Sequence, residues 1–356
     1  MNIEISLTKK PKTKPNFGKD IIPFGKVITD HMFLLDYNNQ DNWHNPRISP
    51  HKPLELDPAA AVLHYSQTIF EGMKAYKSPT GEVLLFRPYE NARRFNISAH
   101  RMFMPKIDEE IFVAGVKSLV EADKDWVPDL PGMSLYIRPF MFCTEATINL
   151  NYPETFLFSV LASPAGLLTG SFTTTRILVE EEYVRAAPGG TGYAKCGGNY
   201  AGAMRAMFDA KSRGYDQVLW LDAIERKYIE EVSAMNIFFV IDGVVVTPAI
   251  SNTILDGVTR KSVIEILKDW DIPVEERKIS IQELAEAHKA GKVDEVFSVG
   301  TAAVVSPIGE ITYSGNAMQF NNNEVGELTQ NVYDELTGIQ TGLREDTRGW
   351  TLKVCS

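Results

Sequence analysis

The stretch GYAKCGGNY, residues 192–200, decides how the rest of the chain is interpreted. It sets one lysine, Lys195, among small residues, so that backbone can close tightly around its amine. Two interpretations compete for this lysine. It is a solvated lysine in a glycine-rich turn, or it is a partly buried amine that forms a Schiff base with a carbonyl compound. The local sequence alone favours the solvated lysine. The choice between the two interpretations therefore depends on the rest of the chain.

Length and composition restrict the class of protein. The 356 residues, 44% of them hydrophobic, predict a globular protein with two domains. The net charge of -10 argues against a nucleic-acid partner, because such proteins concentrate basic residues to neutralise phosphates. No apolar stretch has the length of a membrane span, and a cytoplasmic location is expected. The basic run at residues 9–15 is broken by prolines and is interpreted as a frayed terminus.

The cysteines are few and scattered. Cys143, Cys196 and Cys355 form no CxxC pair and have no histidine cluster nearby, so neither a disulfide framework nor a metal site is expected. Cys196, beside the lysine, is interpreted as a buried and inert thiol rather than a reactive one.

Hydrophobic spacing and turn residues predict alternating strands and helices. Asp242-Gly243 between two apolar runs predicts a hairpin over residues 236–247. In the strand at 134–139, Tyr136 and Arg138 should share one face, because side chains in a strand repeat every second residue. Helices are expected at 91–102, 109–122, 200–212, 261–270 and 281–290, and a closing helix at about 324–336. The linker composition of residues 163–171 places a domain boundary there, between domains at 1–162 and 172–356.

Several weak signals share one chemical theme. The glycine loop at residues 255–260 leads into a helix, whose N-terminus suits an anion, and residues 300–303 form a second loop of small residues. Together with the lysine, an acidic residue at a strand and an arginine-bearing helix, these loops would suit a phosphorylated aldehyde. Pyridoxal phosphate needs an amine, phosphate donors and a carboxylate for its ring nitrogen.

Eight motifs stand in the order found in branched-chain amino acid aminotransferases, and the chain resembles that family from about residue 24 onward. The motifs are FEGMKAY, LFRPYENARRF, YIRPF, YAKCGGNYA, QVLWLD, EEVSAMNIFF, LDGVTRKS and GTAAVVSPIG. The resemblance implies a two-domain α/β fold of fold-type IV. Its N-terminal domain would be smaller, and its C-terminal domain would have a barrel-like β core. It also implies a pyridoxal-phosphate enzyme that acts as a homodimer. With this resemblance, Lys195 is interpreted as the amine that forms a Schiff base rather than as a solvated lysine.

The resemblance also implies roles for particular residues. Lys195 is the Schiff-base lysine, Tyr200 binds the phenolic oxygen of the cofactor, and Glu231 pairs with its ring nitrogen. Arg94 matches the phosphate arginine better than Arg93 does. The remaining cofactor positions are Asn236, Leu255, Val258, Thr259 and Thr301. The substrate positions are Phe24, Tyr65, Phe70, Tyr136, Arg138, Gln217 and Ala302, with Tyr65 serving the partner subunit's site.

The expected reaction is transfer of the amino group of leucine, isoleucine or valine to 2-oxoglutarate. Lys195 would act as the base at the substrate Cα. Some animal members carry a CxxC pair where this chain has Ala303 and Ser306, so thiol regulation through that pair is not expected. Two alternatives use the same scaffold, a D-amino acid aminotransferase and an aminodeoxychorismate lyase. A third is a non-catalytic protein that only binds pyridoxal phosphate.

Overall fold

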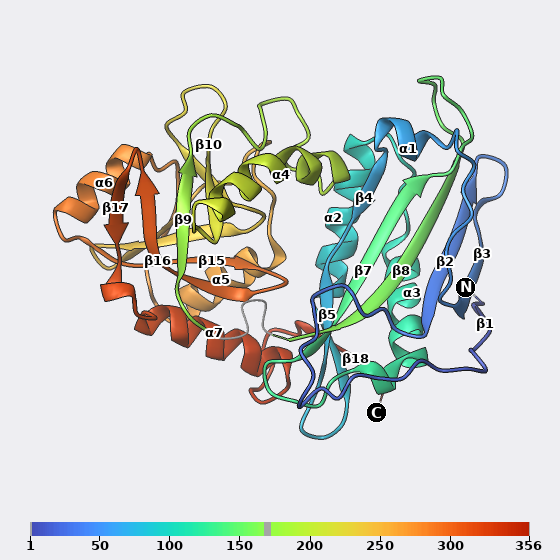
Figure 1. Ribbon diagram of the computed structural model, residues 1–356. Coiled ribbons are helices and arrows are strands. Elements are labelled where there is room, and N and C mark those ends of the chain that lie inside the picture. Colours follow the sequence, from blue (N-terminus) through green and yellow to red (C-terminus); the bar gives the residue numbers. More distant parts are fainter. Residues whose placement is uncertain (1, 167–171, 356) are drawn as a thin grey trace. The chain divides into compact units, whose positions relative to one another are not determined.

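The computed structural model describes residues 2–166 and 172–355 and divides them into two compact units, each built on one β-sheet (Figure 1). The first unit holds residues 2–166, 194–197 and 338–355, and the second holds 172–193 and 198–337. Helices accompany both sheets, in agreement with the predicted α/β class. None of the helices in the described residues combines the length and apolar character that a membrane span needs.

The sheet of the first unit has the strand order β1-β3-β2-β8-β7-β5-β6-β18, and β4 pairs with β7. All of its neighbouring pairs are antiparallel except β1 with β3. The strands are β1 Glu4–Ile5, β2 His31–Asn38, β3 Asn42–Pro50, β4 Thr68–Phe70, β5 Met73–Lys77, β6 Val83–Phe86, β7 Ser134–Cys143, β8 Thr155–Ala165 and β18 Thr351–Cys355. Its helices are α1 Ala61–Tyr65, α2 Pro88–Arg101 and α3 Glu109–Ala122, followed by the short 3-10 helix Lys124–Trp126.

Helices α2 and α3 pack on the sheet of the first unit through a core of aromatic rings (Figure 1). The Phe158 ring lies 5.5 Å from the rings of both Phe95 and Phe112. Helix α3 approaches β2 at Gly115, where a Cβ atom would lie 2.6 Å from the Phe33 ring. The glycine therefore allows this close approach, although glycine weakens a helix.

Strand β7 shows the alternation that its sequence predicts. Leu135 and Ile137 are fully buried in the core beneath the helices. Tyr136 and Arg138 share the opposite face, where Arg138 Nη2 donates a hydrogen bond of 3.0 Å to the Tyr136 hydroxyl. The prediction that these two residues share a face is confirmed.

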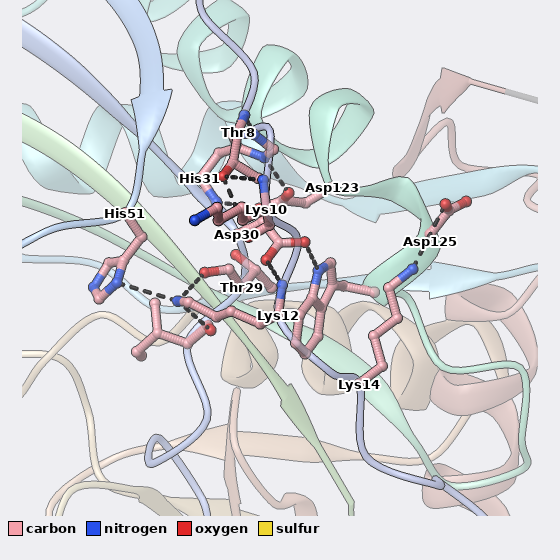
Figure 2. Close-up of polar contacts among 12 residues, drawn as sticks. Thr8, Lys10, Lys12, Lys14, Thr29, Asp30, His31, His51, Asp123 and Asp125 are labelled. Carbon is pink, nitrogen blue, oxygen red and sulfur yellow. Dashed lines mark hydrogen bonds and ion pairs between the residues drawn. The ribbon is translucent and has the colours of Figure 1, made fainter.

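The interpretation of residues 9–15 as a frayed terminus is wrong, because this segment is docked on the first unit. Figure 2 shows the polar contacts. The Thr8 N–H donates to His31 Nε2 at 2.9 Å, so the other ring nitrogen, Nδ1, carries the proton and donates to Asp123 Oδ1 at 2.6 Å. The Lys12 N–H donates to Asp30 Oδ1 at 2.7 Å, and Trp126 Nε1 donates to the other Asp30 oxygen at 2.9 Å. These acceptors lie 18 and more residues away in the chain, so local composition does not reveal them.

The sheet of the second unit has the order β11-β10-β9-β16-β15-β12-β13-β14, and β17 pairs with β16. Parallel and antiparallel pairs are mixed, with β9 parallel to both β10 and β16. The strands are β9 Thr175–Glu180, β10 Gln217–Leu221, β11 Ile229–Val232, β12 Asn236–Ile241, β13 Val244–Thr247, β14 Val274–Glu276, β15 Val293–Gly300, β16 Val304–Tyr313 and β17 Asn316–Gln319. The helices are α4 Gly197–Ser212, α5 Val258–Asp269, α6 Ile281–Lys289 and α7 Glu327–Gln340, with the 3-10 helix Asn321–Asn323 before α7.

The predicted hairpin and helices of the second unit are confirmed to within a few residues. Strands β12 and β13 pair across Asp242-Gly243, and both turn residues have positive φ, as this turn requires. Helix α7 begins and ends slightly later than expected, and it does not close the chain, because β18 follows it.

The segment expected to form the linker is partly a strand. Residues 163–165 continue β8, since Ser163, Pro164 and Ala165 pair with β7, whereas residues 167–171 lie outside the described residues. Strand β18 pairs with β6, so the last residues belong to the first unit rather than to a domain at 172–356. The strand contributes Leu352 and Val354 to the core of the first unit, which gives the physical reason.

Candidate active site

Lys195 lies in the short segment 194–197 that belongs to the first unit. Its backbone N–H donates to Ser98 Oγ of α2 at 2.8 Å, and its carbonyl accepts from the Phe70 N–H at 3.0 Å. The next residue, Cys196, bridges to Ile69 and is 2% exposed. The lysine backbone is therefore fixed between a helix and a strand, which a solvated surface turn would not need.

The side chain of Lys195 is half-buried and its Nζ lies over the Phe70 ring, 4.8 Å from the centroid. An ammonium over an aromatic face is attracted by the ring quadrupole. Gly197, which follows, allows close packing on β4, since a Cβ there would lie 2.9 Å from Thr68 Cγ2. The small residues of the stretch thus permit a close contact with β4. Cys196 is a buried thiol, as expected.

Arg94 is held in the first unit by a buried carboxylate that the sequence analysis missed. Its Nε and Nη2 lie 2.7 and 2.8 Å from the two oxygens of Glu71, a bidentate pair. Asn91 Nδ2 donates a further bond of 2.8 Å to Glu71. Burial raises the pKa of Glu71, but the charge and hydrogen bonds of Arg94, with the charge of Lys195, outweigh it and leave the pKa below its ordinary value. The neighbouring Arg93 is 54% exposed, which supports the choice of Arg94 over Arg93.

Four of the predicted substrate residues meet in the first unit. The Phe24 ring lies edge-on 4.8 Å from Tyr136, and the Arg138 guanidinium lies 4.7 Å over Phe70 and 5.3 Å over Tyr136. Phe70 is also the ring beneath the Lys195 ammonium. The lysine, three aromatic rings and a guanidinium therefore share one neighbourhood. We call Phe24, Phe70, Tyr136 and Arg138 the aromatic wall.

Tyr65 lies elsewhere in the first unit. Its hydroxyl donates a bond of 2.5 Å to the Ile148 carbonyl, and its side chain is 41% exposed. It lines a cavity of about 490 Å³ together with Phe103 and Tyr152. No contact in the described residues brings it to the aromatic wall.

Glu231 lies in β11 of the second unit and is 2% exposed. Its Oε1 accepts the Leu255 N–H at 2.6 Å, and Asn236 Nδ2 donates to the Leu255 carbonyl at 3.0 Å. Gly257, which precedes α5, packs so closely on Asn236 that a Cβ would lie 2.1 Å from its Oδ1. Contacts thus connect Glu231, Asn236 and Leu255 to the start of α5.

The N-terminus of α5 supplies donors at the place predicted for a phosphate. Val258 and Thr259 are the first two helical residues, both are buried, and the preceding Gly257 has no side chain with which to cap the helix. The first turn carries no acidic residue. The backbone N–H groups and the helix dipole make such a terminus favourable for an anion.

The remaining predicted residues of the second unit lie near the ends of its elements. Thr301 and Ala302 lie in the turn between β15 and β16, just beyond Val299, which pairs with Asn236. Tyr200 lies in the first turn of α4. Gln217 opens β10, and its buried Oε1 has no hydrogen-bond partner among the described residues.

Two charged partners of the site were missed in the sequence, Glu71 and Arg185. Arg185 Nε lies 3.2 Å from Glu231 Oε2, and both side chains are buried. Glu71 carried a signal, because it is a lone carboxylate in the apolar run of FEGMKAY. Arg185 carried none, since a lone arginine in a loop is usually solvated. Within the described residues, no group of three or more metal-ligating side chains was found.

The Amino-transferase class IV family matches residues 68–311. The chain is 49% identical to branched-chain-amino-acid aminotransferase 2 of Bacillus subtilis, over 100% of this chain and 97% of that protein. It is 43% identical to a branched-chain-amino-acid aminotransferase of Mycolicibacterium smegmatis, over 93% and 92% of the two chains.

Solved structures are similar as well. The Escherichia coli branched-chain amino acid aminotransferase superposes with a TM-score of 0.77 at 27% identity, covering 91% of this chain and 99% of that one. The branched-chain aminotransferase of the thermophilic archaeon Thermoproteus uzoniensis, solved with norvaline, superposes with a TM-score of 0.74 at 27% identity, covering 91% and 99%. The predicted fold class is thereby confirmed. By sequence over its full length and by fold, the chain belongs to the class IV aminotransferase family.

Proposed function

We infer that this chain is a branched-chain-amino-acid transaminase that uses pyridoxal phosphate. The observation that carries the inference is the position of Lys195, whose backbone is fixed to α2 and β4 and whose amine lies over Phe70 in the aromatic wall. Relatives at 49% identity over the full length support the substrate class.

The residues of the second unit fit the cofactor. A helix N-terminus without acidic residues suits its phosphate, and a buried, backbone-held carboxylate suits its ring nitrogen. In the second unit, Val258, Thr259 and Thr301 would bind the phosphate. In the first unit, Arg94 is the residue that we assign to the phosphate arginine. Tyr200 would bind the phenolic oxygen and Leu255 would pack on the ring. Pyridoxal phosphate, when bound, supplies an electron sink that makes the Cα–H of an amino acid acidic.

Each residue of the chain then has a defined task. The Lys195 amine would hold the cofactor between reactions and, once displaced, would take the proton from the substrate Cα and return it to the adjacent carbon. Glu231 would accept the hydrogen bond of the ring nitrogen and keep that nitrogen protonated. Glu71 would hold the Arg94 guanidinium in place, which the bidentate geometry favours.

The aromatic wall can receive substrates of two polarities. Phe24, Phe70 and Tyr136 offer apolar surface for a branched side chain, and Arg138 with the Tyr136 hydroxyl offers donors for a carboxylate. Size discrimination amounts to only about 1–3 kcal/mol per methylene, so leucine, isoleucine and valine should all react. In the second unit, Gln217 and Ala302 are the residues that we assign to substrate binding.

The test uses the purified holoenzyme. Incubation with L-leucine and 2-oxoglutarate should give glutamate, whereas turnover of D-alanine but not L-leucine would favour a D-amino acid aminotransferase. Lys195→Ala should remove the visible absorbance of the bound cofactor and at least about 99% of the rate, because the base is lost. Lys211→Ala, at an exposed position of α4, is the matched control. Wild-type protein without any cofactor absorbance would contradict the proposal.

The second copy expected of a homodimer would cover an apolar surface of the first unit. Leu63, Phe103, Ile148, Leu150 and Tyr152 are between 59% and 80% exposed. Large exposed apolar groups of this kind mark interaction sites. Tyr65 lies among them, which suits a residue that serves the partner subunit's site. Sedimentation of wild type and of Leu150→Asp tests this, and a monomeric wild type would contradict it.

A cytoplasmic location of the protein also stays a proposal.

A further inference from the structure

A buried arginine contacts the carboxylate that we assign to the ring nitrogen. Arg185 lies between β9 and α4 in the second unit, and its side chain is 6% exposed. Its Nε is 3.2 Å from Glu231 Oε2, and the Glu231 side chain is 2% exposed. Removing two charges from water costs several kcal/mol per ion unless geometry and further hydrogen bonds compensate. The hydrogen bonds that offset this cost therefore identify the groups that hold the ion pair in place.

The guanidinium is held from two other segments. Arg185 Nη2 donates to the carbonyls of Gly192 and Thr253, at 3.0 and 2.6 Å. These segments pack so tightly that a Cβ at Gly192 would lie 2.6 Å from the Thr253 carbonyl oxygen. Arg185 thus connects the strand that carries Glu231 with the segment just before Lys195.

The two oxygens of Glu231 have different partners. Oε1 accepts the Leu255 N–H at 2.6 Å, and Oε2 faces Arg185. The contact at Oε1 is a hydrogen bond, whereas the contact at Oε2 is an ion pair without hydrogen-bond geometry, so the two together restrict how the carboxylate can turn. Leu255 is two residues from Thr253, which Arg185 also contacts, so one loop helps to position both partners.

The neighbouring Glu230 also lies within the influence of the Arg185 charge, but its hydrogen-bond partner is a different residue. Its Oε1 accepts from the Thr253 hydroxyl at 2.5 Å, whereas its buried Oε2 has no hydrogen-bond partner among the described residues. Burial raises the pKa of Glu230, against the Thr253 hydrogen bond and the charge of Arg185, and the Glu231 charge raises it further. The contacts therefore distinguish the two carboxylates, since Arg185 forms its ion pair with Glu231 and the Thr253 hydroxyl donates to Glu230.

We propose that Arg185 is a positioning residue that keeps Glu231 ionised and oriented toward the ring nitrogen of the cofactor. The inference rests on the proposed function. Without the guanidinium, the ionised form of a carboxylate this deeply buried is disfavoured. Glu231 would then hold the proton of the ring nitrogen less firmly, and Lys195 would abstract the Cα proton more slowly.

The test compares Arg185→Met, Arg185→Lys and the control Arg176→Met. Arg176 also pairs with a glutamate, Glu310, in the same unit, but its side chain is 52% exposed. The readout is the ¹⁵N NMR shift of the ring nitrogen at neutral pH, measured on labelled pyridoxal phosphate bound without substrate, which reports how much of that nitrogen is protonated. Arg185→Met should move the resonance toward that of the unprotonated ring, because a buried Glu231 without its counter-charge takes a larger share of the proton that it shares with the ring nitrogen. Arg185→Lys should move the resonance less, and Arg176→Met should leave it unchanged.

The rate of the half-reaction with L-leucine should fall about 10- to 100-fold in Arg185→Met, the range seen when a residue that orients a functional group is lost. If Arg185→Met does not fold, the resonance of Arg185→Lys decides, and an unchanged resonance overturns the inference. An unchanged resonance in folded Arg185→Met overturns it as well, while wild-type transamination leaves the proposed function intact. Wild-type protein that binds no pyridoxal phosphate overturns the proposed function and this inference with it.

Discussion

At the residue scale, the aromatic wall depends on the absence of a side chain at Gly72. A Cβ there would lie 2.3 Å from the Tyr136 hydroxyl and 3.1 Å from Cζ. Gly72→Ala should therefore displace Tyr136 and break its 3.0 Å hydrogen bond with Arg138. We expect the KM for L-leucine to rise about tenfold, since overpacking costs about 1–3 kcal/mol.

Steady-state kinetics check this prediction, and Gly202→Ala is the matched control. Gly202 lies on an exposed face of α4 with no atom near its Cβ position among the described residues, so alanine should leave the KM unchanged and stabilise the helix slightly. An unaltered KM in Gly72→Ala would show that Tyr136 does not contact the substrate.

The ion pair between Glu71 and Arg94 makes a second prediction at this scale. Glu71→Ala should lower the free energy of unfolding by about 3–5 kcal/mol, because it removes the carboxylate that pairs with the buried Arg94 charge. The double variant with Arg94→Met should be more stable than Glu71→Ala. Urea unfolding measures both, and the exposed Arg93→Ala should change stability by no more than about 0.5 kcal/mol. If Glu71→Ala and Arg93→Ala cost the same, the pair is not a structural requirement.

The ion pair between Glu71 and Arg94 also makes the stability of the first unit depend on pH. The folded state depresses the pKa of Glu71 below its ordinary 4.5, so the pair contributes its full stability above that value. The contribution is lost as the pH falls through the lower pKa of the folded state. Unfolding curves between about pH 5 and pH 3 should therefore show a smaller loss of stability in the Glu71→Ala and Arg94→Met double variant than in wild type.

At the element scale, the docked N-terminal segment should loosen as the pH falls. Lys12 Nζ donates to His51 Nδ1 at 3.2 Å, so that nitrogen must be unprotonated, and burial and the Lys12 charge lower the pKa of His51 below 6.5. A histidine with a depressed pKa in the folded state contributes stability above its unfolded value, and this is lost at lower pH. His31 Nε2 is also an acceptor here, for the Thr8 N–H (Figure 2).

Hydrogen exchange of residues 8–14 at about pH 7.5 and about pH 5.5, on either side of the ordinary histidine pKa, measures the loosening. Exchange should speed up at the lower pH relative to the core strands, beyond the intrinsic pH effect. His51→Gln should reduce the difference, because the titrating ring is then absent. Equal differences in wild type and variant would assign the effect to another group.

The elements show why some features were predictable. The hairpin at Asp242-Gly243, helix α3 and the shared face of Tyr136 and Arg138 follow from local spacing and turn chemistry, and all three are confirmed. The contacts of Thr8 with His31, of Glu71 with Arg94 and of Arg185 with Glu231 join residues 23, 23 and 46 positions apart. Such contacts depend on the tertiary arrangement, which no local pattern specifies. The roles of the site residues came from ordered motifs, and they stay predictions until the variants are measured.

At the scale of the whole molecule, the two compact units do not follow the chain as two consecutive blocks. Residues 194–197, with Lys195, belong to the first unit although residues on both sides belong to the second. Strand β18 comes after the second unit in the chain and pairs with β6 of the first. Composition predicted a domain boundary near residue 163. It could not reveal that residues 194–197 and strand β18 belong to the first unit.

Because the last residues of the chain pack in the first unit, we expect a substitution near the C-terminus to destabilise that unit. Trp350 is 6% exposed, its ring lies 5.6 Å from Phe86, and the Arg87 guanidinium lies over it at 4.7 Å. Its carbonyl accepts the Arg87 N–H at 2.7 Å. Trp350→Ala should cost about 3–5 kcal/mol, the usual range for truncating a buried tryptophan. Backbone amides of β5 and β6 should then lose protection from hydrogen exchange before those of β9 and β16 do.

The control Leu343→Ala, at a side chain that is 72% exposed, should leave the protection of both sheets unchanged. If Trp350→Ala instead weakened protection in β9 and β16 as much as in β5 and β6, the two units would unfold as one, and the destabilisation could not be assigned to the first.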